Sequence, residues 1–166
     1  DVKGFENAMA ADRADVIVLS VPAYHAADTV EAVADRLDDG DVLVTPATGM
    51  RRDDDGFHYH RPNAGSVTEL VADAAPEDVA VVGAFHNLAA GRLANLDAEL
   101  GVDTLLVGED EDALDTVELL AESIEGLRAL RAGGLANAPE IEALTPLLVN
   151  VGQHTEGLHD LGVRFQ

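Results

Sequence analysis

Short, continuously apolar runs recur along this chain, and segments with helical spacing separate them. Four of the runs are rich in valine and leucine: residues 15–22, 41–46, 79–83 and 103–108. Such runs are typical of strands buried on both faces, as in parallel sheets covered by helices. A further edge strand is expected at residues 127–130, before Gly133 and Gly134.

The segments between these runs predict helices. Ser66 is followed by Glu69 in a capping-box pattern, so a helix is expected to begin there. Further helices are expected at residues 6–12, 28–37, 90–100, 114–126 and 138–154. Pro146 should kink or divide the last of these, because proline lacks the amide hydrogen that an inner helical turn needs. Two segments carry no helical pattern: residues 47–64 are interpreted as a loop, and residues 162–165 as a short closing strand or tail.

Strands and helices therefore alternate several times along the chain. This alternation indicates an α/β fold built from right-handed βαβ units, with a mostly parallel sheet. With 166 residues, the chain is long enough for one large domain, or for one domain with an appendage.

The composition is strongly acidic. The chain has 32 acidic and 10 basic residues, of which only Lys3 is a lysine, and its formal net charge is −22. An acidic, lysine-poor surface favours a protein that stays soluble in concentrated salt, so a halophilic source is expected; the family resemblance described below implies that this source is an archaeon. The lack of a basic stripe argues against nucleic acid as a partner. The acidic runs lack EF-hand spacing, so they are interpreted as solvated faces rather than calcium sites.

Other classes are disfavoured by what the sequence lacks. It contains no cysteine, which excludes disulfides and thiolate chemistry. No apolar run is long enough to span a membrane and no signal peptide is recognisable, so the cytoplasm is the expected location. The sequence begins at Asp1 without a methionine, and we expect either a fragment or a chain whose start is not included.

The candidate chemistry lies at the ends of the predicted strands. No Gly-x-Ser-x-Gly motif is present, and His58 and His60 lack a nearby third ligand, so no metal site is predicted. Small and polar residues instead follow three strands: Ser20-Val21-Pro22, Thr45-Pro46-Ala47 and Phe85-His86-Asn87. Open α/β sheets bind ligands at the carboxyl ends of parallel strands. These weakly charged ends suit a flat aromatic cofactor better than hydrolytic chemistry.

His86 has two interpretations from its position alone. It can contact a ligand at the sheet edge, or it can satisfy a structural hydrogen bond at a strand end and do nothing more. The small residues Ala89, Ala90 and Gly91 follow it, and they would let a flat ligand approach the backbone closely.

Five segments stand in an order and at spacings that point to one family: Val16–Pro22, Ala84–Asn87, Gly126–Arg128, Leu144–Leu148 and Leu161–Phe165. Together they resemble the NADPH-dependent coenzyme F420 reductases, the F420H2:NADP oxidoreductases, over essentially the whole chain. The resemblance implies a Rossmann-type, doubly wound α/β domain at residues 1–135 and a small C-terminal helical part at residues 136–166. It also implies a homodimer.

The resemblance further implies NADP and coenzyme F420 as cofactors, with direct hydride transfer between nicotinamide C4 and deazaflavin C5. His86, Asn87 and Leu88 would lie against the deazaflavin, with His86 as the catalytic residue. Thr145 and Leu161 would close the pocket. The residues implied on the NADP side are Ser20, Val21, Pro22, Ala23, Thr45 and Pro46.

One part of the family pattern lies outside this sequence. The Gly-rich phosphate loop of the family belongs to an N-terminal strand–helix–strand unit, so this chain alone is expected to bind NADP weakly and to be inactive. Two alternatives stay open: a related NAD(P)-dependent reductase with another acceptor, and a non-catalytic Rossmann-like binding domain. A Gly-rich strand–turn–helix encoded upstream would favour the enzyme.

Overall fold

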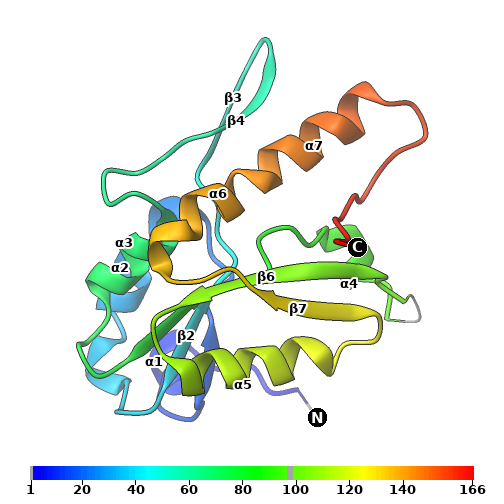
Figure 1. Cartoon of the computed structure of the whole chain (residues 1–166). Coiled ribbons are helices and arrows are strands. Elements are labelled where there is room, and N and C mark those ends of the chain that lie inside the picture. Colours follow the sequence, from blue (N-terminus) through cyan, green and yellow to red (C-terminus); the bar gives the residue numbers. More distant parts are fainter. Residues whose placement is uncertain (1, 97–98) are drawn as a thin grey trace.

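A five-stranded sheet forms the centre of the molecule in the computed structural model, which describes residues 2–96 and 99–166 (Figure 1). The strands lie side by side in the order β1 (Val16–Val18), β2 (Val42–Thr45), β5 (Ala80–Gly83), β6 (Val102–Gly108) and β7 (Leu127–Arg131). The pairs β1–β2, β2–β5 and β6–β7 are parallel. The predicted α/β fold with a mostly parallel sheet is therefore confirmed, although β1 is shorter than the run at residues 15–22.

The strands β5 and β6 run in opposite directions, with Val82 opposite Gly108. The chain that leaves β5 consequently continues beside the N-terminal half of β6. There the amide of Phe85 donates a hydrogen bond to Thr104 Oγ1 at 3.0 Å. The reversal thus brings the start of β6 next to the residues that follow β5.

Helices cover both faces of the sheet because the strands are apolar on both. Side chains of α5 such as Val117 pack with Leu106 in one cluster, and Val71 of α3 packs with Leu43 in another. Ile141 of α6 packs with Val107, the neighbour of Leu106 in β6. Neighbouring strand residues point to opposite faces, so α5 covers one face, and α3 and α6 the other. The α-helices are α1 (Asn7–Ala11), α2 (Ala26–Glu31), α3 (Val67–Ala74), α4 (Ala90–Leu93), α5 (Glu111–Glu122), α6 (Ala138–Glu142) and α7 (Leu144–His154).

The prediction of a loop at residues 47–64 is wrong. An antiparallel hairpin, β3 (Met50–Asp53) and β4 (Gly56–Tyr59), lies within it and projects from the body of the molecule beside α7 (Figure 1). Every residue of β3 is exposed, so the segment has no apolar alternation. The side chain of Asn150 holds the hairpin instead, because it accepts from the Phe57 amide at 2.8 Å and donates to the Phe57 carbonyl at 2.7 Å. A contact between residues so distant in sequence leaves no local pattern.

Several helices are shorter than predicted. The helix expected at residues 28–37 ends at Glu31, and a 3-10 turn follows it at Ala34–Arg36. The helix expected at residues 90–100 covers only the four residues of α4, and residues 97–98 lie outside the described part.

The predicted division of the last helix is confirmed. Ala143 separates α6 from α7, and Pro146 lies in the first turn of α7, where a missing amide hydrogen costs little. At the other helix start that the sequence singled out, Ser66 caps α3 by accepting from the Glu69 amide at 2.9 Å, as predicted.

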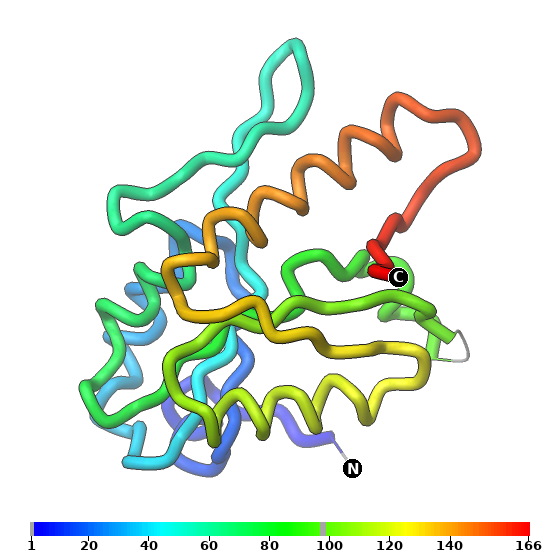
Figure 2. Tube along the Cα trace, in the orientation of Figure 1, coloured from blue at the N-terminus to red at the C-terminus, as the bar shows by residue number. Residues whose placement is uncertain are grey.

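After α7 the chain turns back and returns to the sheet, as the tube in Figure 2 shows. We call residues 155–166 the C-terminal tail. Val163 of the tail forms a single antiparallel bridge with Asp103 of β6, so the expected closing strand is reduced to one pair.

Candidate functional site

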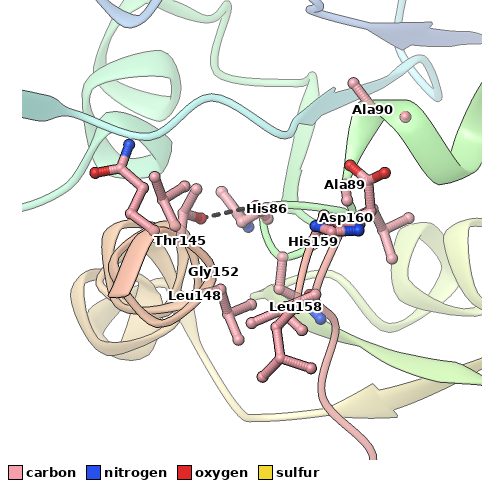
Figure 3. Close-up of a pocket in the computed structure, with 15 residues that line it drawn as sticks. His86, Ala89, Ala90, Thr145, Leu148, Gly152, Leu158, His159 and Asp160 are labelled. Carbon is pink, nitrogen blue, oxygen red and sulfur yellow. Dashed lines mark hydrogen bonds between the residues drawn. The ribbon is translucent and has the colours of Figure 1, made fainter. Parts of the chain in front are cut away.

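A cavity of about 520 Å³ lies between α7, the segment that follows β5, and the C-terminal tail. Figure 3 shows its lining side chains, with His86 and Thr145 on one side and Leu158 and His159 of the tail on the other. Five residues that the sequence predicted for the site line this cavity: His86, Asn87, Leu88, Thr145 and Leu161. Its volume is in the range of small-molecule and cofactor sites.

The backbone at the end of β5 sets the position of His86. Phe85 has a positive φ of 65°, a left-handed conformation that non-glycine residues adopt rarely, and it turns the chain just before His86. Thr145 Oγ1 of α7 then donates to the carbonyl of His86 at 2.7 Å, which is the dashed line in Figure 3. His86 is therefore held from two sides, by the turn at Phe85 and by α7.

The His86 side chain is buried and neutral near pH 7. It is 4% exposed, and burial lowers its pKa to about 4 because a charged imidazolium is poorly solvated there. Its Nε2 lies 3.5 Å from Thr68 Oγ1 of α3. Its Nδ1 has no hydrogen-bond partner in the described part of the chain.

Asn87 carries a second unpaired polar atom. Its Nδ2 donates to the carbonyl of Asp103 at 2.7 Å, which orients the amide and leaves Oδ1 without a partner among residues 2–96 and 99–166. Buried polar atoms in native proteins are nearly always paired, so two unpaired ones in residues that line one cavity indicate a place for a polar ligand group. The residues present thus fit a ring cofactor with apolar faces and a polar edge.

The tail is fixed against the sheet by an ion pair. Arg128 of β7 donates from Nε and Nη2 to the buried carboxylate of Asp103 at 2.8 and 2.7 Å. Hydrogen bonds from Arg128 hold the pKa of Asp103 below its usual value. The Phe165 amide donates to the same carboxylate at 2.7 Å, and Arg128 also donates to the Phe165 carbonyl at 2.6 Å. The tail residues Leu158–Leu161 thereby become a wall of the cavity.

Gly91 lies beside Asp160 of the tail and lines the cavity. A Cβ at Gly91 would lie 2.6 Å from the Asp160 carboxylate, so a larger residue there would displace this side chain of the tail. The small residues Ala89, Ala90 and Gly91 all line the cavity, and their role in admitting a flat ligand stays a prediction.

The other predicted site residues lie at the same edge of the sheet but do not line this cavity. They lie at or just after the ends of β1 and β2 and are Ser20, Val21, Pro22, Ala23, Thr45 and Pro46. Thr45 is fully buried, and its Oγ1 accepts from the Ala47 amide at 3.3 Å. A hydroxyl pair, Thr48 and Thr145 at 3.2 Å, links the segment after β2 to α7.

Other residues of the cavity wall were not predicted from the sequence. Leu148 and Gly152 of α7 lie three and seven positions after Thr145, a helical spacing that could have identified them. His159 and Asp160 of the tail carry no comparable signal, since the tail has no regular period.

Across the described residues, no three His, Cys, Asp or Glu side chains gather as a metal site, and His58 instead bonds Asp53 at 2.9 Å. No helix in the described ranges is long and apolar enough to cross a membrane.

Known proteins resemble this chain in sequence and in fold. The family described as NADP oxidoreductase coenzyme F420-dependent matches residues 1–49. The chain is 35% identical to the F420-dependent NADP reductase of Methanocaldococcus jannaschii over 153 residues, which is 91% of this chain and 68% of that protein. It is also 35% identical to the F420-dependent NADP reductase of Methanothermobacter marburgensis over 167 residues, covering 99% of this chain and 74% of that protein.

Two solved structures extend the comparison. One, from Arthrobacter sp. FB24 and assigned as a candidate F420-dependent NADP reductase, has a TM-score of 0.81 at 18% identity and covers 96% of this chain and 72% of its own. A hypothetical protein from Sinorhizobium meliloti has a TM-score of 0.64 at 30% identity, with 80% and 63% coverage. The first similarity concerns the fold alone.

Proposed function

Because this chain belongs to the family of F420-dependent NADP reductases, we propose that it binds NADP(H) and coenzyme F420 and transfers a hydride between them. One observation in the molecule carries this proposal. The cavity beside His86 has mostly apolar walls, and two of its lining residues carry buried polar atoms without a partner among the described residues, which suits a flat ring with a polar edge.

The residues of the cavity would orient rings and exclude water. When bound, the nicotinamide and the deazaflavin supply the hydride chemistry at C4 and C5. Leu88 and Leu161 offer apolar surface, and His86 is neutral, so this histidine places no charge against the ring faces. Orientation matters because transfer rates fall steeply when reacting atoms are misplaced.

The NADP side is proposed at the ends of β1 and β2. Ser20, Pro22 and Pro46 follow strands that run parallel to β5, so their ends lie at the edge of the sheet where α/β proteins bind ligands. The same proposal includes four further points: a division into residues 1–135 and 136–166, a homodimer, a cytoplasmic location and a halophilic source.

Turnover with different acceptors tests the function. Full-length protein should oxidise NADPH with coenzyme F420 and do so poorly with FMN, because the cavity is proposed to select the deazaflavin. Equal or faster turnover with FMN in the same assay would contradict the proposal and favour a reductase with another acceptor. No turnover with either, from a correctly folded protein, would favour a binding domain.

A further inference from the structure

A buried carboxylate, Glu142, contacts Thr68, which in turn contacts His86, and Glu142 is not part of the cavity wall. Glu142 is the last residue of α6 and is fully buried. It receives four hydrogen bonds. At Oε2 they come from the Val67 amide at 3.1 Å and the Tyr59 hydroxyl at 3.0 Å, and at Oε1 from the Thr68 amide at 2.9 Å and hydroxyl at 3.0 Å.

These contacts define which atoms carry hydrogens. A carboxylate accepts and does not donate, and four donors face Glu142, so the single hydroxyl hydrogen of Thr68 is directed at Glu142. Thr68 Oγ1 can then only accept from His86 Nε2, 3.5 Å away. A neutral imidazole that donates at Nε2 is an acceptor at Nδ1.

We propose that Glu142, acting through Thr68, is a positioning residue that holds His86 as its Nε2–H tautomer. The two buried atoms of this pair of residues that lack a partner in the described part of the chain are then both acceptors, because Asn87 Nδ2 is already directed at Asp103 and only Oδ1 is unpaired. A ring that reaches these two atoms would meet them with an N–H group. In a deazaflavin this is the N–H of its pyrimidine ring, an assignment that rests on the proposed function.

The buried hydroxyl can be removed with little other change. Thr68→Val keeps the shape of the side chain and the hydrogen bond from the Thr68 backbone amide to Glu142, at the start of α3. It removes the hydroxyl and with it both the bond to Glu142 and the contact with His86. Thr68→Ser retains the hydroxyl and should restore the wild-type behaviour. Tyr59→Phe is the matched control, because it removes another hydroxyl from Glu142 but at the opposite oxygen.

The first measurement needs no cofactor. The measurement is a ¹⁵N-histidine spectrum of the full-length protein, with the His86 signals assigned by His86→Gln. The wild type, Thr68→Ser and Tyr59→Phe should show a protonated Nε2 and an unprotonated Nδ1 at His86. Thr68→Val should shift His86 toward the other tautomer. A wild type protonated at Nδ1, or a tautomer that Thr68→Val leaves unchanged, would overturn the proposal whatever the cofactor is.

The second measurement tests the ligand edge. F420 affinity should fall about fivefold in Thr68→Val, as expected for the loss of about one hydrogen bond, and return in Thr68→Ser, while NADP affinity stays unchanged. If NADP affinity falls instead, the assignment of the N–H group to the deazaflavin is overturned. If the wild type does not bind F420 at all, the proposed function fails, and the tautomer measurement still decides the role of Glu142.

Discussion

At the scale of single residues, burial of His86 makes stability depend on pH. Its pKa is about 4 in the folded chain and about 6.5 when exposed. Between these values the unfolded chain binds more protons, so the free energy of unfolding falls as the pH drops through this window and levels off below it. A shift of this size corresponds to roughly 3 kcal/mol.

Urea denaturation between pH 7 and pH 4.5 measures this effect as a difference between variants. His86→Gln should lose less stability than the wild type over the range, by up to about 3 kcal/mol. The exposed His154→Gln should follow the wild type, and it controls for the many carboxylates that titrate as well. Parallel pH profiles for wild type and His86→Gln would show that His86 is not buried as a neutral group.

His86→Ala separates the two interpretations of this histidine. If His86 contacts the deazaflavin, F420 affinity or the single-turnover rate of hydride transfer in the full-length protein should fall, with NADPH binding close to normal. A purely structural histidine would instead lower the free energy of unfolding by ~1–3 kcal/mol and leave F420 affinity and rate unchanged. We expect the first result, because His86 lines the cavity.

At the scale of elements, the ion pair between β6 and β7 positions the tail. Arg128→Met removes the hydrogen bond to the Phe165 carbonyl and leaves the Asp103 carboxylate without its cation. Hydrogen exchange of the Phe165 amide should then speed up, and F420 affinity should fall several-fold as the Leu158–Leu161 wall loosens. Arg131→Met is the matched control on the same strand, because Arg131 pairs with Glu111, Asp115 and Glu118 of α5. Equal effects of the two substitutions would mean that the tail does not depend on Arg128.

The elements of the core could be predicted and those held by distant contacts could not. Apolar runs and the Ser66 cap are local signals, and they identified the sheet and α3. The reversal between β5 and β6, the Asn150 contact with β4 and the bridge from Asp103 to Val163 join residues far apart in sequence. The same holds for the site: His86 was visible at a strand end, whereas the hydrogen bonds of Glu142 appear only once α3 and α6 are packed.

At the scale of the whole molecule, the net charge of −22 should make folding depend on salt. Repulsion between like charges acts over about 30 Å at 0.01 M salt and about 3 Å at 1 M. The melting temperature should therefore rise substantially between dilute buffer and molar potassium chloride, because screening removes more repulsion than it costs in exposed ion pairs. A flat profile across that range would show that the acidic side chains are locally compensated.

The projecting hairpin β3–β4 has a consequence for engineering. Its base is anchored at Phe57 by α7 and at Tyr59 by Glu142, whereas the turn at Asp54 and Asp55 lies at the exposed tip. Exposed polar tips accept inserted sequence without disturbing a core. A fluorescent domain inserted between Asp54 and Asp55 would leave both anchors in place. The hairpin would connect this domain to α7, and another face of α7 lines the cavity. The fluorescence of such a fusion therefore tests whether filling of the cavity is transmitted through α7 to the hairpin.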